Sequence, residues 1–275
     1  MPKTWTTITA CLVLSACATA SDERSSTRRL DDAVRSRPLV LIGEVHDNVE
    51  QHRLRAQALQ VLLASGARPA LLMEQFDRER QADLDRVLAR PGVTPDDVIA
   101  AATTGDPAMQ GWSWPLYRPY LALAIAYRLP VVAVNVSRAD TRVIVARGLS
   151  AQGFDATVPN DIRRPQAEAI VAGHCGLIDT PLATRMSDAQ VARDQYMAHA
   201  IATHADGAVL LAGNGHVRRD IGVPRWLDAT TRAHSVSIGL IETEDADADA
   251  FDVTITTPSQ SRGDPCEGMR QPPAR

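Results

Sequence analysis

Aromatic residues are scarce in this sequence of 275 residues, where they make up 4% of the chain. Alanine, leucine and valine must therefore fill the core, which suits helices packed on a sheet. An excess of charge of one sign is also missing, because 29 basic residues stand against 33 acidic ones. The basic residues are spread along the chain and form no basic patch of the kind that binds nucleic acid. Nucleic acid is therefore not an expected partner.

Long apolar runs are absent as well. The mildly apolar segment Ile8–Leu14 is far shorter than the roughly 20 residues that cross a bilayer. It leads into Leu14-Ser15-Ala16-Cys17, which resembles the bacterial lipobox, in which the cysteine becomes the lipidated first residue. We therefore predict a lipoprotein signal peptide at 1–16, a lipidated N-terminus and polar tether at 17–37, and one domain at 38–275. An ordinary signal peptide with an incidental Cys17 is the alternative.

The residue after Cys17 bears on where such a lipoprotein is sent. Residue 18 is Ala18 and not an aspartate, which resembles lipoproteins sorted to the outer membrane. The expected location is therefore the cell envelope, with a lipid anchor in the outer membrane and the domain facing the periplasm.

Cysteine is nearly absent beyond the signal region, where only Cys175 and Cys266 remain. In an oxidising envelope compartment an isolated pair usually forms a disulfide. It would tie the loop around Cys175 to the Pro-rich tail around Cys266. Two thiolate ligands to a metal are less favoured, because no Cys-x-x-Cys spacing is present. His174, beside Cys175, is ambiguous and stays outside the predicted site.

Short, uninterrupted apolar runs alternate with helical patterns along the chain. Such runs are typical of strands that are covered on both faces, as in a parallel sheet. Strands are expected at 39–42, 70–73, 131–134, 208–212, 235–241 and 251–256. Helices are expected at 51–64, 120–127 and 187–204, the last opened by Ser187 as its cap. The pattern predicts a single-domain α/β fold with a mainly parallel central sheet and helices on both faces.

Two strand ends carry the same short pattern. Leu41-Ile42-Gly43-Glu44-Val45-His46 and Leu211-Ala212-Gly213-Asn214-Gly215-His216 both run from apolar residues through glycine to histidine. The carboxyl ends of parallel strands lie at one edge of a sheet, where open α/β sheets bind ligands. We therefore expect a binding cleft formed by polar residues at these ends, namely Glu44, His46, Asp47, Glu74, Asn135, Asn214 and His216.

Glu44, His46 and His216 supply this cleft with a carboxylate and two imidazoles. The set matches either a divalent metal site of the two-His, one-carboxylate kind or a histidine base oriented by a carboxylate. Asp47 and Glu74 would then fix the imidazole tautomers. The chain has no His-Glu-x-x-His helix and no Gly-x-Ser-x-Gly elbow, so the common zinc proteases and serine hydrolases are not supported.

Taken in order, these motifs resemble one protein family. They are Gly43–Asn48 with Gln51-His52, Met73–Phe76, Trp114-x-x-Tyr117-Arg118-Pro119, Asn135, Asp194-x-x-Met197-Ala198 and Ala212–Val217. The set resembles the ChaN-like family of iron-regulated, haem-binding bacterial lipoproteins, a branch of the Tiki, TraB and erythromycin-esterase superfamily. The resemblance implies haem as the ligand, a role in iron or haem uptake, an outer-membrane haem or iron receptor as a partner, and a haem-bridged homodimer. The superfamily also implies an alternative function, a metal-dependent hydrolase in which Glu44, His46 and His216 are catalytic.

The family resemblance further implies a tyrosine as ligand to the haem iron, with basic or histidine groups on the propionates. Such a tyrosine must be ionised, which requires a nearby cation or hydrogen-bond donor. Tyr120, Tyr127 and Tyr196 fall on helices that are expected to pack on the sheet. Tyr117 and Arg118, in a Pro-bounded loop, are therefore the predicted haem-binding residues. A packing role for Tyr117 is the alternative.

Overall fold

The computed structural model of the chain describes residues 24–103, 111–243, 248–264 and 266–267, so the predicted signal peptide and Cys17 lie outside the described part. Its centre is a six-stranded sheet with the order β3-β2-β4-β1-β5-β6. All neighbouring strands are parallel. The predicted α/β fold is confirmed. The strands are β1 (Leu39–Ile42), β2 (Ala70–Asp77), β3 (Val131–Asn135), β4 (Ala208–Leu211), β5 (Ser235–Glu242) and β6 (Val253–Thr257).

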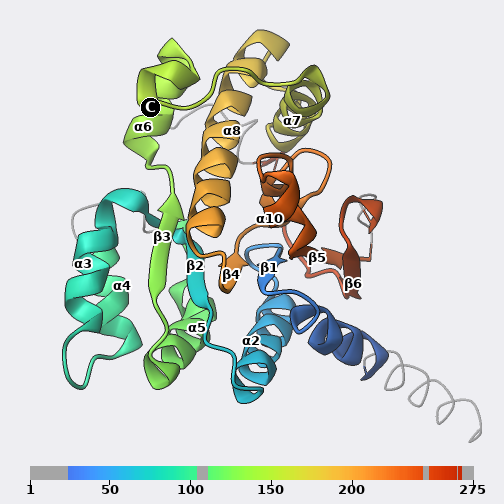
Figure 1. Cartoon of the computed structure of the whole chain (residues 1–275). Coiled ribbons are helices and arrows are strands. Elements are labelled where there is room, and N and C mark those ends of the chain that lie inside the picture. The colour runs from blue at the N-terminus through green and yellow to red at the C-terminus, as the bar shows by residue number, and fades with distance from the viewer. Residues whose placement is uncertain (1–23, 104–110, 244–247, 265, 268–275) are drawn as a thin grey trace, which may run out of the picture.

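Helices cover both faces of this sheet (Figure 1). Alternate strand residues face opposite sides, so Val40 and Ile42 pack in one core cluster and Leu39 and Leu41 in another. The first cluster lies under residues 24–34 and the helices α2 (Val49–Ala64), α3 (Gln81–Leu88), α4 (Pro95–Thr103) and α5 (Trp114–Tyr127). The second lies under the C-terminal half of α8 (Thr180–Thr203), α9 (Asn214–Val217) and the short turn Val223–Arg225.

Further helices stand beyond the carboxyl edge of the sheet. Figure 1 shows α6 (Arg138–Arg147), α7 (Asn160–Gly173) and the first half of α8 on this side, above the tips of the strands. They pack together through their own small apolar cluster, which includes Ile144, Ile162 and Val191. We call this group of helices the cap. The short helix α10 (Ala229–Ala233) leads into β5.

The folded part of the chain begins earlier than the sequence predicts. Residues 24–34 are helical, and Leu30, Ala33 and Val34 are buried in the larger core cluster. The prediction that the tether extends to residue 37 is therefore wrong for this stretch. These apolar residues, at a spacing of i, i+3 and i+4, form a stripe too short to stand out in a charged segment.

The start of α8 also differs from the prediction. Asp179 caps the helix, because its side chain accepts a hydrogen bond of 2.8 Å from the backbone N–H of Leu182. Pro181 lies in the first turn, where a missing N–H costs nothing. Ser187, the predicted cap, is fully buried within the helix and bonds back to the carbonyl of Thr184.

In the structure Cys175 and Cys266, which are 91 positions apart in sequence, form a disulfide with 5.8 Å between their Cα atoms. It attaches the C-terminal segment to the end of α7. In the part of the chain that the structure describes, no helix combines the length and apolar character that a membrane span requires.

Candidate functional site

The ends of β1 and β4 meet closely at the centre of the sheet's carboxyl edge. The two strands are neighbours and pair Ile42 with Leu211, so Gly43–His46 and Gly213–His216 leave the sheet side by side. The backbone N–H of Asn214 donates to the carbonyl of Glu44 over 2.9 Å. A Cβ on Gly43 would lie 2.3 Å from Asn214 Oδ1, and only glycine permits this approach.

Glu44 is the centre of a buried polar cluster on the α2 and α5 side of the sheet. Its carboxylate accepts a 2.7 Å hydrogen bond from the Tyr117 hydroxyl and lies 3.2 Å from His52 Nε2. The fully buried guanidinium of Arg55 pairs with the same carboxylate. Arg55 thus balances the charge of Glu44, which makes the burial of that charge tolerable. His46 Nδ1 lies 3.2 Å from the outer face of this carboxylate.

His216 is the centre of a second cluster, on the α8 side. Its Nδ1 lies 2.6 Å from Asp194 Oδ1, and its Nε2 lies 3.5 Å from Glu74 Oε1. The other oxygen of Glu74 accepts a 2.7 Å hydrogen bond from the backbone N–H of Gly213. Burial alone would lower the pKa of His216, but the two carboxylates outweigh it and raise the pKa to about 10. The imidazole is therefore charged at neutral pH.

The two carboxylates beside His216 respond to burial differently. Burial opposes ionisation of Glu74, but the charged His216 and the N–H of Gly213 hold its pKa well below the usual range. For Asp194 burial prevails and raises the pKa. We regard Glu74 as the ionised partner and Asp194 as the group that takes up a proton first on acidification.

His46 stands between the two clusters and faces solvent. Its side chain is 49% exposed, and its ring lies edge-on to Trp112 with 4.8 Å between the centroids. The Cε1–Nε2 edge lies against Gly213, where a Cβ would be 2.8 Å from Cε1 and 3.1 Å from Nε2. The glycine is required here because the imidazole occupies the space of its side chain.

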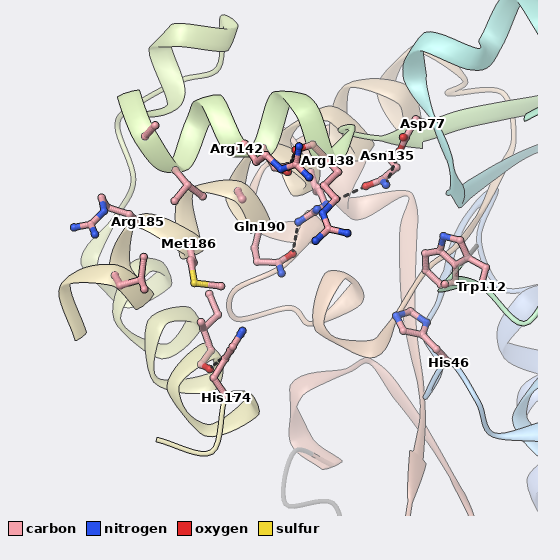
Figure 2. Close-up of a pocket in the computed structure, with 18 of the residues that line it drawn as sticks. His46, Asp77, Trp112, Asn135, Arg138, Arg142, His174, Arg185, Met186 and Gln190 are labelled. Carbon is pink, nitrogen blue, oxygen red and sulfur yellow. Dashed lines mark hydrogen bonds between the residues drawn. The ribbon is translucent and has the colours of Figure 1, made fainter. Parts of the chain in front are cut away.

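A cavity of about 980 Å³ opens between these strand ends and the cap. Figure 2 shows His46 and Trp112 on one side, with Met186, Arg185 and His174 across the cavity. The volume is at the upper end of the roughly 300–1,000 Å³ that is usual for ligand pockets. Apolar side chains from the cap line part of its wall: Val145, Ala146, Ile170, Leu182, Met186 and Ala189.

Four arginines border the same cavity. Arg193 is fixed to its wall, since its Nε donates to Asn135 Oδ1 over 2.9 Å. Arg138, Arg142 and Arg185 differ, because none has a carboxylate within ion-pair distance among the described residues. The cavity therefore combines an apolar wall with three arginines that form no ion pair among the described residues, while Asp47 and Asp77 also contribute to its lining.

The predicted cleft residues lie at this edge, but they do not converge on one point. Asp47 pairs with Arg262 at 2.6 Å and not with an imidazole. The Asn214 amide donates to the carbonyl of Leu240 over 2.6 Å. The Asn135 amide donates to Asp77 over 2.8 Å, beside the cavity. These three residues thus fix the loops around the cleft.

The metal site predicted from Glu44, His46 and His216 is not formed by the described residues. Among them, no group of three or more histidine, cysteine, aspartate or glutamate side chains is arranged to hold a metal ion. Glu44 and His216 belong to different clusters, and both nitrogens of His216 already face carboxylates. The spacing in the sequence could not reveal that these lone pairs are occupied.

The predicted loop around Tyr117 and Arg118 is a helix. Both residues lie in α5, and Tyr117 is fully buried with its hydroxyl on Glu44. Burial raises the pKa of Tyr117, which opposes the ionised form that iron would need. Arg118 pairs with Asp96 on the surface and does not line the cavity. The position of Tyr117 corresponds to the packing alternative.

Sequence reasoning missed several residues that build the site. Arg55 lies on the buried stripe of α2, four residues after Gln51 and four before Leu59. This helical spacing was the only feature of the sequence that indicated its burial. Asp194 belongs to the motif Asp194-x-x-Met197, which pointed to no role for the carboxylate. The unpaired arginines of the cap follow no motif, since α6 and α8 are distant in sequence.

Comparison with known proteins gives a family and a related structure. The sequence model of the family described as "Haem-binding uptake, Tiki superfamily, ChaN" matches residues 31–227. The solved structure of cofacial haem binding to ChaN of Campylobacter jejuni has a TM-score of 0.69 at 18% identity, and the match covers 84% of this chain and 90% of that one. No curated protein sequence matches the chain.

Two further solved structures share less of the fold. The type III effector HopBA1 matches with a TM-score of 0.48 at 14% identity, over 86% of this chain and 94% of that one. An erythromycin esterase mutant in its open conformation matches with a TM-score of 0.44 at 12% identity, over 78% and 72% of the two chains.

Proposed function

We propose that this chain, which belongs to the haem-binding uptake family of the Tiki superfamily that includes ChaN, binds haem in the cavity beneath its cap. Haem combines a flat apolar macrocycle with two carboxylates, so its site needs both an apolar wall and cations. The similar structure from Campylobacter jejuni is one of haem binding. In this chain the cavity of about 980 Å³ has both parts of such a site.

The observation that carries the proposal is the set of three arginines without acidic partners. Arg138 and Arg142 project from α6 and Arg185 from α8, and all three border the cavity (Figure 2). A guanidinium binds a carboxylate through two parallel hydrogen bonds, which makes arginine well suited to a propionate. Most other arginines near the sheet edge are paired, as Arg78 is with Asp140 and Arg163 with Asp188.

Hemin titration of the apo-protein tests this assignment. We expect a saturable shift of the Soret band in the wild type. The double variant Arg138→Gln/Arg142→Gln should bind hemin on the order of tenfold or more weakly, because charge-assisted hydrogen bonds are lost. Arg147→Gln, on the same helix but outside the cavity, is the matched control. Absence of saturable binding contradicts haem binding, and equal affinity of the double variant and wild type contradicts this cavity as the site.

The cellular role is the finer part of the proposal. We infer a lipid-anchored envelope protein at the outer membrane, facing the periplasm, that receives haem for iron uptake. The lipobox-like Leu14–Cys17 and the family description support this inference. An outer-membrane haem or iron receptor is the corresponding partner.

Haem shared between two copies of this chain is a further part of the proposal, supported by the cofacial arrangement in ChaN of Campylobacter jejuni. Sedimentation velocity of the protein with and without hemin tests it. A monomer that binds hemin but keeps its sedimentation coefficient would contradict a haem-bridged homodimer.

A second candidate function is hydrolysis with His46 as a base, and one observation favours it. His46 exposes its ring to the cavity while its Nδ1 lies 3.2 Å from the buried Glu44 carboxylate. A carboxylate that orients an imidazole is a usual arrangement of a general base. Hydrolysis of p-nitrophenyl acetate should then disappear in His46→Ala and persist in His199→Ala, whose residue is exposed on α8. Equal rates in both variants would exclude it.

A further inference from the structure

We propose that His174 is the residue of this chain that coordinates the haem iron, an inference that rests on the proposed haem binding. His174 follows the last residue of α7 and lines the cavity. Its Nδ1 lies 2.8 Å from the carbonyl oxygen of Ile170, which can only accept a hydrogen bond. The proton must therefore be on Nδ1, which leaves the lone pair of Nε2 available. Figure 2 shows this second nitrogen pointing away from that bond and toward the cavity.

The hydrogen bond alone does not distinguish His174. His204 and His234 also follow helix ends and place Nδ1 2.8 and 2.9 Å from the carbonyls of Ala200 and Thr230. This is a common way to satisfy the last carbonyls of a helix. His174 differs from the other two because it lines the cavity with the unpaired arginines. The same bond is also what a metal-binding histidine needs to fix its tautomer.

The other iron-binding side chains of the cavity are less suited. Haem iron in proteins is usually held by histidine, cysteine, methionine or tyrosine. Among the described residues that line the cavity, the candidates are His46, His174 and Met186. His46 holds its Nδ1 3.2 Å from Glu44 and stands at the strand end, across the cavity from Met186 of the apolar cap wall, whereas His174 lies on the cap side (Figure 2). Met186 stands near His174 in Figure 2 and supplies a weaker, neutral thioether.

The segment after His174 is held in a fixed conformation. Cys175 has a φ of 58°, in the left-handed region that costs energy for a residue with a side chain. Its disulfide to Cys266 and the 2.9 Å hydrogen bond from the N–H of Gly176 to the carbonyl of Val171 hold this turn. The imidazole is thus positioned before any ligand arrives, which reduces the entropy lost on coordination.

Hemin binding and iron-free protoporphyrin IX binding, measured side by side on the folded chain with its disulfide intact, test the assignment. In His174→Gly, hemin affinity should fall on the order of tenfold or more, and the Soret band should lose its histidine-ligated position. Added imidazole should restore that position. Protoporphyrin IX affinity should stay within about twofold, because no iron is present to coordinate. His204→Ala and His234→Ala, which remove the same local hydrogen bond outside the cavity, should match the wild type.

The failure of this inference differs from the failure of haem binding itself. If the wild type does not saturate with hemin, the proposed function fails. If the wild type saturates and His174→Gly has the same spectrum and affinity, haem binding stands and His174 is not the ligand. Loss of both hemin and protoporphyrin IX binding, without imidazole rescue, would show that His174 only shapes the cavity. Loss of the spectrum in His46→Ala alone would assign the iron to His46.

Discussion

Replacing His216 by alanine should destabilise the protein strongly, because it removes the cation between two buried carboxylates. The His216 side chain is only 12% exposed, and Asp194 and Glu74 are at least as buried. Removing one partner of a buried ion pair costs roughly 3–5 kcal/mol, since the remaining charges stay without compensation. We expect the free energy of unfolding of His216→Ala to fall by that amount at pH 7.

The pH dependence gives an independent measure of the same interaction. The pKa of His216 is raised from 6.5 to about 10, so its contribution is complete below pH 6.5 and is lost as the pH rises through 10. At about 1.4 kcal/mol per pKa unit, the raised pKa contributes roughly 4 kcal/mol at pH 7 and roughly 1.5 kcal/mol at pH 9. Wild-type stability should therefore fall by at most about 3 kcal/mol between these pH values, and His216→Ala should not show this fall.

Urea unfolding followed by tryptophan fluorescence, with the disulfide intact, measures both effects. His199→Ala, an exposed histidine on α8, is the control and should change stability by less than about 0.5 kcal/mol. Adding Asp194→Asn to His216→Ala should recover part of the loss, since it removes one uncompensated charge. The reasoning is refuted if His216→Ala costs less than about 1 kcal/mol or keeps the wild-type fall in stability between pH 7 and pH 9.

Three further predictions concern other parts of the chain. Gly213→Ala should cost about 1–3 kcal/mol by displacing His46, whereas Gly215→Ala, with no atom within 4 Å of the added Cβ, should cost less; equal urea midpoints would contradict the close contact. Thiol labelling of the unfolded, unreduced chain should find Cys175 and Cys266 blocked, and reduction should cost about 4–5 kcal/mol of stability by loop entropy; two free thiols would exclude the disulfide. Cys17→Ala should leave an unprocessed precursor, and normal maturation with retained membrane binding would argue against lipidation.

The sequence by itself determined the architecture and the location of the site. Runs such as Leu39–Ile42 and Ala208–Leu211 are apolar without alternation, which is the pattern typical of strands that are buried on both faces. The glycines and histidines after these two strands identified the neighbouring ends at which the cavity lies. These features are local. A few consecutive residues determine whether a strand is buried on both faces and whether the chain can turn sharply at its end.

Only the tertiary structure decided which polar groups act together. In the sequence, Glu44 and His216 look like equivalent ligands. In the structure, the Glu44 carboxylate is already bound by Arg55 and Tyr117. The two nitrogens of His216 already face Asp194 and Glu74. These partners lie far away in sequence or are hidden on the buried faces of helices. Charge pairing and burial depend on distances in space. Helix packing therefore decides which lone pairs and cations remain available to a ligand, among them those of His174 and the cap arginines.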